Sequence, residues 1–484
     1  MIFNDLEPVN VWKYFDEICK IPRLSKNEEQ IRQYLIDFAE REHLEHKSDE
    51  AGNVLIIKPA FPGFEKRKSV LLQSHMDMVG EKDAATEHDW AKDPIKPFID
   101  GRWVKAKETT LGADDGIGMA AQLALLADRD IKTGKIECLF TVDEESGMTG
   151  AIDLGKNFFE SKILINLDSE DEGELFIGCA GGMDTVAEME YTKENRPEEQ
   201  ESLKISVNGL HGGHSGDEIH KGFANSVKIM TSLLQELSDS FNIRLSDFNG
   251  GNLRNAIPRE AFARITCDEG KAEEIKKYVE AYAEKVRSDY SKTEPDLSIS
   301  VNKIKPVAHI INTETQKSLL KALDECPHGV IKWSEDMEGL VETSTNLASV
   351  KFTGEKIRIV TSQRSSVESE KKEIAARINR VFTNAGASVR HSGGYPGWKP
   401  DTNSEILNIT RSSYRRLFGT DPVVRAIHAG LECGLILEKY PGLDMISFGP
   451  TIYGAHTPQE RLDIETTKKF WDLLLDVLEN IPPA

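Results

Sequence analysis

The sequence predicts a mixed α/β fold: a mostly parallel sheet covered by helices, interrupted by an inserted α+β domain. Up to about residue 186, apolar strand-like runs alternate with helix-like segments, as in a parallel sheet covered by helices. The segments that follow alternate polar and apolar residues, as half-exposed antiparallel strands do. A chain of 484 residues also exceeds one ordinary core. We therefore expect one domain built from residues 1–186 and 398–484, with residues 187–397 inserted into it.

The first domain is predicted from buried-strand runs and from one helix of small residues. Continuous apolar runs predict buried strands at residues 69–74, 136–142, 162–167 and 444–450. Between the first two runs, the segment GIGMAAQLALLAD (116–128) predicts a helix rich in small and apolar residues. The N-terminal segment predicts a short lead into an amphipathic helix.

The inserted domain has a different pattern of polar and apolar residues. The polar segment YTKENRPEEQES (191–202) is expected to be a crossing or surface loop. Alternating strand-like segments follow at residues 203–210, 261–268, 296–304, 348–354 and 356–363. Long helical stretches near 271–287 and 368–385 separate some of them. The Gly- and Pro-rich segment HSGGYPGWKPD (391–401) is expected to be the hinge back to the first domain.

Composition excludes several classes of partner. The formal charge of −21, from 60 basic and 81 acidic residues, repels phosphate backbones, so we expect no nucleic-acid partner. No apolar run approaches the roughly 20 residues that cross a bilayer, and the N-terminus has no basic start followed by an apolar stretch. We therefore expect a cytoplasmic protein that is not bound to a membrane. Six scattered cysteines without a CxxC pair predict neither a disulfide framework nor a thiolate metal site.

Metal-competent residues follow the predicted strands of the first domain. In open α/β sheets, ligands bind beyond the carboxyl ends of the strands. Such side chains follow four strand-like runs and open one helix: His75 and Asp77, then Asp143, Glu144 and Glu145, then Asp168, then His456, with Asp114 and Asp115 at the helix start. Each cluster alone is as well explained by a structural histidine or a solvated acidic surface. Their joint occurrence predicts a metal site held by oxygen and nitrogen ligands.

The residue types suit a pair of divalent ions. Two ions about 3.5–4 Å apart can polarise a carbonyl and activate water together. So close a cationic pair needs an anionic bridge, for which Asp114 is the candidate. Each ion then takes one imidazole and one carboxylate. His75 with Asp168 forms one set, and His456 with Glu145 forms the other.

Two further residues complete the predicted hydrolytic site. Asp77 lies two residues beyond His75 and can accept the other imidazole N–H, which fixes the tautomer of the ring. Glu144 is adjacent to the ligand Glu145 but projects differently. It is the candidate general base for a water molecule and the later acid for a leaving amine. The sequence therefore predicts a two-metal hydrolase that cuts a small amide substrate.

These motifs resemble the M20 metallopeptidase family, and within it the aminoacyl-histidine dipeptidases. The resemblance is carried, in order, by LLQSHMDMV, TTLGADDGIGMA, TVDEESGMTGA, INLDSEDEGELFIGCAGG and YGAHTP. The segment HDWAKDPIKPFIDGRWVKAKETTLGADDGIG is characteristic of that subgroup, and the similarity runs nearly end to end.

The resemblance implies more than the residue types do. It implies two zinc ions, with cobalt or manganese as other metals that the ligands accept, and the roles given above to the seven site residues. It implies a cis peptide bond between Asp114 and Asp115, and an inserted domain that acts as a lid. On this lid, His214 would polarise the substrate, and Asn255 and Arg364 would bind it. It also implies a homodimer and a small dipeptide substrate of Xaa-His type, including β-alanyl-histidine.

Some alternatives stay open at this level. An N-acyl amino acid deacylase or another amidase would use the same metal ligands, and a non-catalytic relative would retain the same fold. Within AIHAGLECGLI (426–436), His428 and Glu432 form either a local structural pair or part of the substrate site.

Overall fold

The chain folds into two compact units, described here from a computed structural model covering residues 2–216 and 218–484. The first unit comprises the chain up to Cys179 together with Pro400–Ala426 and Leu431–Ala484. The second unit comprises Ala180–Lys399 and Ile427–Gly430. The chain thus crosses between the units a few residues before the position expected from composition. It also crosses at a second place, where four residues beyond the main insertion join the second unit.

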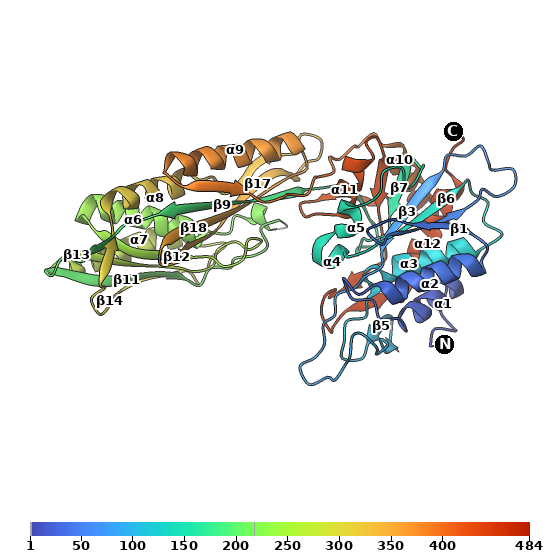
Figure 1. Ribbon diagram of the computed structural model, residues 1–484, viewed down its shortest axis with the longest axis horizontal. Coiled ribbons are helices and arrows are strands. Elements are labelled where there is room, and N and C mark those ends of the chain that lie inside the picture. Colours follow the sequence, from blue (N-terminus) through green and yellow to red (C-terminus); the bar gives the residue numbers. More distant parts are fainter. Residues whose placement is uncertain (1, 217) are drawn as a thin grey trace. The chain divides into compact units, whose positions relative to one another are not determined.

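A mixed eight-stranded sheet forms the centre of the first unit (Figure 1). Its strands are, in spatial order, β1 (Glu45–Ser48), β2 (Val54–Lys58), β6 (Ile136–Thr141), β3 (Val70–His75), β7 (Ile163–Asn166), β21 (Asp444–Ser447), β8 (Glu174–Cys179) and β20 (Val423–Ile427). The four neighbours β6, β3, β7 and β21 are parallel, whereas β1, β2 and β8 pair antiparallel. Every residue of β3, β6 and β7 is buried, as expected for parallel strands that are covered on both faces.

Helices of the first unit pack on this sheet in recognisable groups. Helix α1 (Val9–Ile18) packs against α3 (Ala113–Ala127), which contacts β3. Helix α10 (Glu405–Phe418) packs against α12 (Ile464–Glu479) and contacts β21. Helix α2 (Glu29–Arg41) lies against β1 and β2. The glycines and alanines of α3 explain why nearly the whole helix is buried, because small side chains let the strands approach its backbone.

The first unit also contains short helices and a second, smaller sheet. Two short helices, α4 (Glu144–Gly147) and α5 (Thr149–Ile152), follow β6, and α11 (Glu432–Lys439) packs against α5. A separate four-stranded sheet has the order β22 (Ile452–Tyr453), β23 (Arg461–Asp463), β5 (Trp103–Ala106) and β4 (Pro97–Asp100). The hairpin between β22 and β23 therefore holds residues 454–460 in a short, constrained loop.

The second unit is an antiparallel sheet with helices. Its path is β14 (Ser298–Lys303), β11 (Gln200–Asn208), β13 (Ala261–Asp268), β12 (Arg244–Gly250), β17 (Val341–Phe352), β18 (Lys356–Ser365), β9 (Gly181–Glu190) and β19 (Ser388–His391), with β16 (Gly329–Trp333) beside β17. Helices α6 (Ser226–Phe241), α7 (Ala272–Asp289), α8 (Thr313–Glu325) and α9 (Glu368–Asn384) share one buried apolar core with the sheet. Along β13, the exposed residues Phe262, Arg264 and Asp268 alternate with buried ones over most of the strand, so its other face is open to solvent.

The polar segment 191–202 is largely exposed, as expected for a surface segment, but it is not a crossing between the units. Strand β9 already lies in the second unit, β10 (Lys193–Asn195) pairs with β15 (His309–Ile311), and β11 begins at Gln200. Exposed strand residues are polar for the same reason as loop residues, so polarity alone did not separate the two. Among the described residues, no helix is both long enough and apolar enough to span a bilayer.

Candidate metal centre

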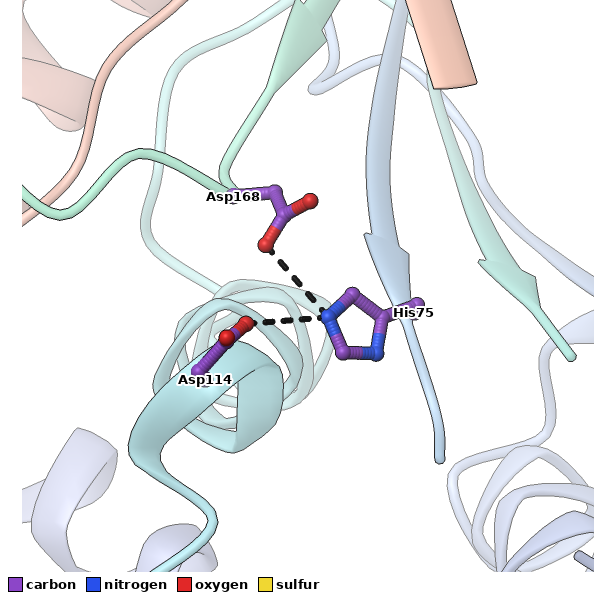
Figure 2. Close-up of side chains that lie close together, drawn as sticks. All are labelled: His75, Asp114 and Asp168. Carbon is purple, nitrogen blue, oxygen red and sulfur yellow. Dashed lines mark hydrogen bonds and ion pairs between the residues drawn. The ribbon is translucent and has the colours of Figure 1, made fainter. Parts of the chain in front are cut away.

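Three side chains meet where two neighbouring parallel strands end (Figure 2). His75 is the last residue of β3, and Asp168 follows the end of β7 by two residues. Asp114 comes from the first turn of α3. The Nε2 atom of His75 lies 3.0 Å from Oδ1 of Asp114 and 3.4 Å from Oδ1 of Asp168. Because β3 and β7 are neighbours in the sheet, His75 and Asp168 meet although they are 93 positions apart in the sequence (168 − 75).

A second triad shares Asp114 with the first. The Nε2 atom of His456 lies 3.2 Å from Oδ2 of Asp114 and 2.9 Å from Oε2 of Glu145. Glu145 lies in α4, just beyond β6, and His456 lies in the hairpin loop between β22 and β23. His456 has a φ of 62°, a left-handed conformation that is uncommon for residues other than glycine and is frequent at functional sites.

Asp114 has the geometry of a bridging ligand. Its two carboxylate oxygens face different imidazoles, Oδ1 that of His75 and Oδ2 that of His456. Gly112 precedes it with a φ of 68°, and Asp114 and Asp115 have non-helical backbone angles although they are assigned to α3. The Asp114–Asp115 peptide bond is cis, as the family resemblance implied.

The donor set fits two divalent cations. The single Nε2 atom of His75 can donate only one hydrogen, yet two carboxylates converge on it. The Oε1 atom of Glu145 is buried and has no hydrogen-bond partner among the described residues, an arrangement that a cation would satisfy. Carboxylate and imidazole ligands suit zinc, manganese and cobalt, and no cysteine belongs to either group.

Asp77 supports both the histidine and the glutamate pair. Its Oδ1 atom lies 3.3 Å from Nδ1 of His75, on the side of the ring opposite the triads. Its carboxylate also accepts the backbone N–H groups of Glu144 (3.0 Å) and Glu145 (3.2 Å) and the hydroxyl of Ser25 (2.7 Å). Burial raises the pKa of Asp77, but the contacts with His75 and these donors outweigh it and lower the pKa to about 2. Asp77 is therefore an anion that faces the His75 ring at the end of β3 and holds the first turn of α4.

The carboxylates of the centre raise the pKa values of both histidines. Burial disfavours a charged His75, but Asp168, Asp114 and Asp77 together hold its pKa well above the ordinary value. The hydrogen bonds that the His456 imidazole donates to the carboxylates of Asp114 and Glu145 raise the pKa of His456 to about 11. Protons here stand in for the positive charge that so many carboxylates require.

Glu144 lies beside the two triads that share Asp114. One of its carboxylate oxygens lies close enough to His75 and Glu145 for these three residues to form a third group that could hold a metal ion. Burial, reinforced by the neighbouring carboxylates, raises the pKa of Glu144 to about 8. A buried carboxylate with a raised pKa, next to a cation site, has the properties of a general base.

The sequence analysis missed two buried residues that hold the loop around Asp114 in place. The buried carboxylate of Glu460 accepts backbone N–H groups along this loop, from Leu111 (2.7 Å), Gly112 (3.0 Å), Ala113 (2.7 Å) and Asp114 (3.4 Å). The buried guanidinium of Arg23 donates to the carbonyl oxygens of Met76, Asp77 and Gly112, and so joins the loop to the end of β3. The position of Glu460, four residues beyond His456, was the only available signal.

His428 and Glu432 are held by different partners in different units. Nε2 of His428 lies 2.8 Å from the hydroxyl of Ser344 in the second unit. Glu432 begins α11 in the first unit, where its carboxylate accepts hydrogen bonds from Gln73 and Thr141, each at 2.7 Å. Burial raises the pKa of Glu432 to about 7. Each residue therefore has a local structural environment of its own.

The remaining predicted residues all lie in the second unit. His214 forms an isolated bridge with Ala256, and its N–H donates to Glu218 at 2.9 Å. The carbonyl of Asn255 accepts the N–H of Ser215 at 2.8 Å. The 211–216 and 253–257 segments are thereby joined, so His214 and Asn255 are neighbours. Arg364 lies on β18 and is buried.

The fold and this centre define a class, that of hydrolases with carboxylate and imidazole ligands for a metal pair at the carboxyl edge of an α/β sheet. The comparisons with known proteins identify the family. The sequence profile described as Peptidase family M20/M25/M40 matches residues 71–480, and the chain belongs to this family. This confirms the resemblance inferred from the motifs.

Individual relatives match the chain over nearly its full length. It is 43% identical to the cytosol non-specific dipeptidase of Escherichia coli K12 over 479 residues, which cover 99% of each protein. The crystal structure of aminoacylhistidine dipeptidase from Vibrio alginolyticus matches with a TM-score of 0.96 and 42% identity, covering 100% of this chain and 98% of that one. A tripeptidase from Staphylococcus aureus, at 18% identity, covers 98% and 99% of the two chains with a TM-score of 0.57, which shows a shared fold.

Proposed function

We propose that this chain is a two-metal dipeptidase that hydrolyses the peptide bond of dipeptides, of Xaa-His type and including β-alanyl-histidine. The observation that carries the proposal is the pair of ligand triads sharing Asp114. The printed names of the two full-length relatives support the dipeptide substrate. One of these names specifies a histidine dipeptide and the other a non-specific dipeptidase, so the substrate panel described below includes both Xaa-His and other dipeptides.

His75, Asp168 and Asp114 would hold one ion, and His456, Glu145 and Asp114 the other. We propose zinc, with cobalt and manganese as substitutes, since all three accept these donors. When bound, the ions would polarise the scissile carbonyl and make water acidic enough to deprotonate near neutral pH. Asp77 keeps the Nδ1 side of His75 occupied, so that Nε2 faces the ligand triad.

Glu144 would move the proton. Its carboxylate accepts a proton from the attacking water and later returns it to the departing amine, which leaves neutral. The raised pKa makes this carboxylate a stronger base than an exposed glutamate. The backbone of Glu144 is fixed by its hydrogen bond to Asp77, so the proton carrier and the histidine ligand depend on one anchor.

The second unit would contribute substrate recognition. We propose that His214 polarises the substrate carbonyl and that Asn255 and Arg364 bind the substrate. An arginine can hold a carboxylate with two parallel hydrogen bonds, which a lysine cannot do. A free carboxylate next to the cleaved bond is what distinguishes a dipeptide from an interior stretch of a longer chain.

A Glu144→Gln variant tests the mechanism. Metal content measured by mass spectrometry should remain at two ions per chain, while kcat falls by roughly 10²–10⁴-fold, the usual contribution of a general base. Undiminished turnover would remove Glu144 from the mechanism.

A substrate panel tests the activity. Metal-stripped and zinc-restored protein is assayed with Xaa-His dipeptides, other dipeptides and their N-acetylated forms. Zinc-dependent cleavage that favours free amino ends and a C-terminal histidine is expected. Strict preference for acetylated substrates would point instead to an N-acyl amino acid deacylase. Less than one tightly bound ion per chain, with no turnover after addition of zinc, cobalt or manganese, would point to a non-catalytic relative.

We further propose a homodimer that resides in the cytoplasm. The name of the Escherichia coli relative places that protein in the cytosol, which supports this location. Light scattering should give twice the chain mass of 54.1 kDa. A mass equal to that of one chain at micromolar concentration would refute the dimer.

A further inference from the structure

The Arg364 guanidinium is buried with part of its hydrogen-bonding capacity unused. The residue is 8% exposed and stands next to the end of β18. Its Nη1 donates to the hydroxyl of Tyr395 at 3.2 Å. Its Nε is buried and has no acceptor among the residues that the structure describes. Because a buried charged donor without an acceptor is costly, the unused Nε points to an anionic ligand.

Tyr395 is tied to the strand that pairs with Arg364. Its N–H donates to the carbonyl of Gly182, and its carbonyl accepts the N–H of Gly182, both at 3.0 Å. Gly182 lies directly opposite Arg364 in the antiparallel pair of β9 and β18. The ammonium of Lys371, itself almost wholly buried, donates to the same Tyr395 carbonyl at 2.5 Å. The backbone of Tyr395 therefore cannot shift without breaking three hydrogen bonds.

Two glycines make room for the Tyr395 ring. A Cβ atom at Gly182 would lie 2.7 Å from ring atoms, and one at Gly430 would lie 2.6 Å from Cε2. Residues directly opposite each other in an antiparallel pair point to the same face of the sheet. The missing side chain of Gly182 thus leaves the space beside Arg364 to the phenol, with the Gly430 backbone on its other side.

We infer that Tyr395 is a positioning residue that aims the guanidinium of Arg364 at the free α-carboxylate of the substrate. The phenol occupies Nη1 and leaves the edge formed by Nε and Nη2 to a carboxylate, which that edge can bind with two parallel hydrogen bonds. A phenol is neutral, so it orients the arginine without cancelling its charge, as a carboxylate partner would. This inference rests on the proposed dipeptidase function and narrows it to substrates with an uncapped carboxyl end.

The test uses a Tyr395→Phe variant, which removes the hydroxyl and keeps the ring. KM and kcat are measured for the dipeptide that the wild type cleaves best and for its C-terminal amide. KM for the free acid should rise by about tenfold with kcat within about twofold, because the lost contact serves binding. The amide should be cleaved by the variant as by the wild type. Tyr282→Phe is the matched control, because it also removes a phenol hydroxyl that makes a 3.2 Å hydrogen bond, in this case donated to the carbonyl of Ile229 in the core of the same unit. The KM of this control variant should not change.

Two further variants separate positioning from stability. Gly430→Ala pushes the ring without touching Arg364 and should reproduce the acid-selective rise in KM. In an Arg364→Ala background, Tyr395→Phe should have no further effect on KM, since it acts through the arginine. An unchanged KM in the folded Tyr395→Phe variant, equal losses for acid and amide, or additive losses in the double variant would each overturn the inference. A wild type that cleaves no dipeptide would instead refute the proposed function, so the two failures are distinguishable.

Discussion

Replacing Glu460 by glutamine changes one atom of the carboxylate that holds the loop in front of Asp114. One oxygen, Oε2, accepts the N–H groups of Leu111 and Gly112, and the other, Oε1, accepts those of Ala113 and Asp114. The residue is 2% exposed, so water cannot replace a lost acceptor. In glutamine one of the two oxygens becomes an NH₂ group, which is itself a donor and faces two backbone donors.

The cost can be estimated from these contacts. A buried donor without its acceptor costs about 1–3 kcal/mol, so two of them imply a loss of roughly 2–6 kcal/mol in unfolding free energy. The loop can relieve part of this by moving, and its movement displaces the carboxylate of Asp114 from both imidazoles. Loss of a partner that orients a metal ligand lowers metal affinity by about 10–100-fold. We expect a loss in that range for both ions, because Asp114 faces both histidines.

The assay compares two buried carboxylates. Glu137 accepts the backbone N–H groups of Glu160 (3.1 Å) and Ser161 (2.8 Å) in the same unit but is not part of either ligand triad. Zinc affinity is measured by chelator competition, and stability by urea unfolding of the metal-free protein. The measurements are made at pH 8, because burial raises the pKa of Glu460. Glu137→Gln should lower stability and leave zinc affinity unchanged. Glu460→Gln with wild-type zinc affinity would refute the role of Glu460 in holding Asp114.

Three further predictions follow from single contacts. Asp114→Asn should bind at most one ion per chain, and retention of two by elemental analysis would rule out the bridging role. Asp77→Asn should lower zinc affinity by about tenfold, because a neutral amide then replaces the anionic carboxylate that faces Nδ1 of His75 at 3.3 Å; unchanged affinity in chelator competition would contradict this. Burial lowers the pKa of His328 to about 4, and its Nδ1 accepts the N–H of Leu347. The folded pKa lies below the unfolded value near 6.5, so the stabilisation is present above pH 6.5 and is lost as the pH falls towards 4. Between pH 7 and 5, wild-type unfolding free energy should fall by about 2 kcal/mol more than that of His328→Gln, and equal slopes would exclude the effect.

The meeting of the proposed metal ligands was predictable because their positions depend on simple rules. His75 and Asp168 follow strands that the apolar runs identified, and the carboxyl ends of parallel strands share one edge of the sheet. Imidazole and carboxylate side chains can also be recognised in a sequence as possible metal ligands. His456 was found for a further reason, since it follows a buried strand near the end of the chain and completes a donor set that was otherwise one imidazole short.

The limits of the inserted part were less predictable. Composition placed its start at residue 187, whereas β9 belongs to the second unit from Gly181. The apolar run before β9 gave no break at Cys179, because strands on both sides of the crossing are buried. The return of Ile427–Gly430 to the second unit has no compositional mark at all.

The sequence by itself determined the fold class, the family and the five side chains that meet in the two triads, since these depend on residue types at strand ends and on motif order. Only the tertiary structure decided what holds those side chains and Arg364 in place. Glu460 acts on backbone N–H groups, and Tyr395 depends on the absence of two Cβ atoms. Backbone groups and empty space carry no residue-type signature, and their partners are distant along the chain, so such supports become visible only when the chain is folded.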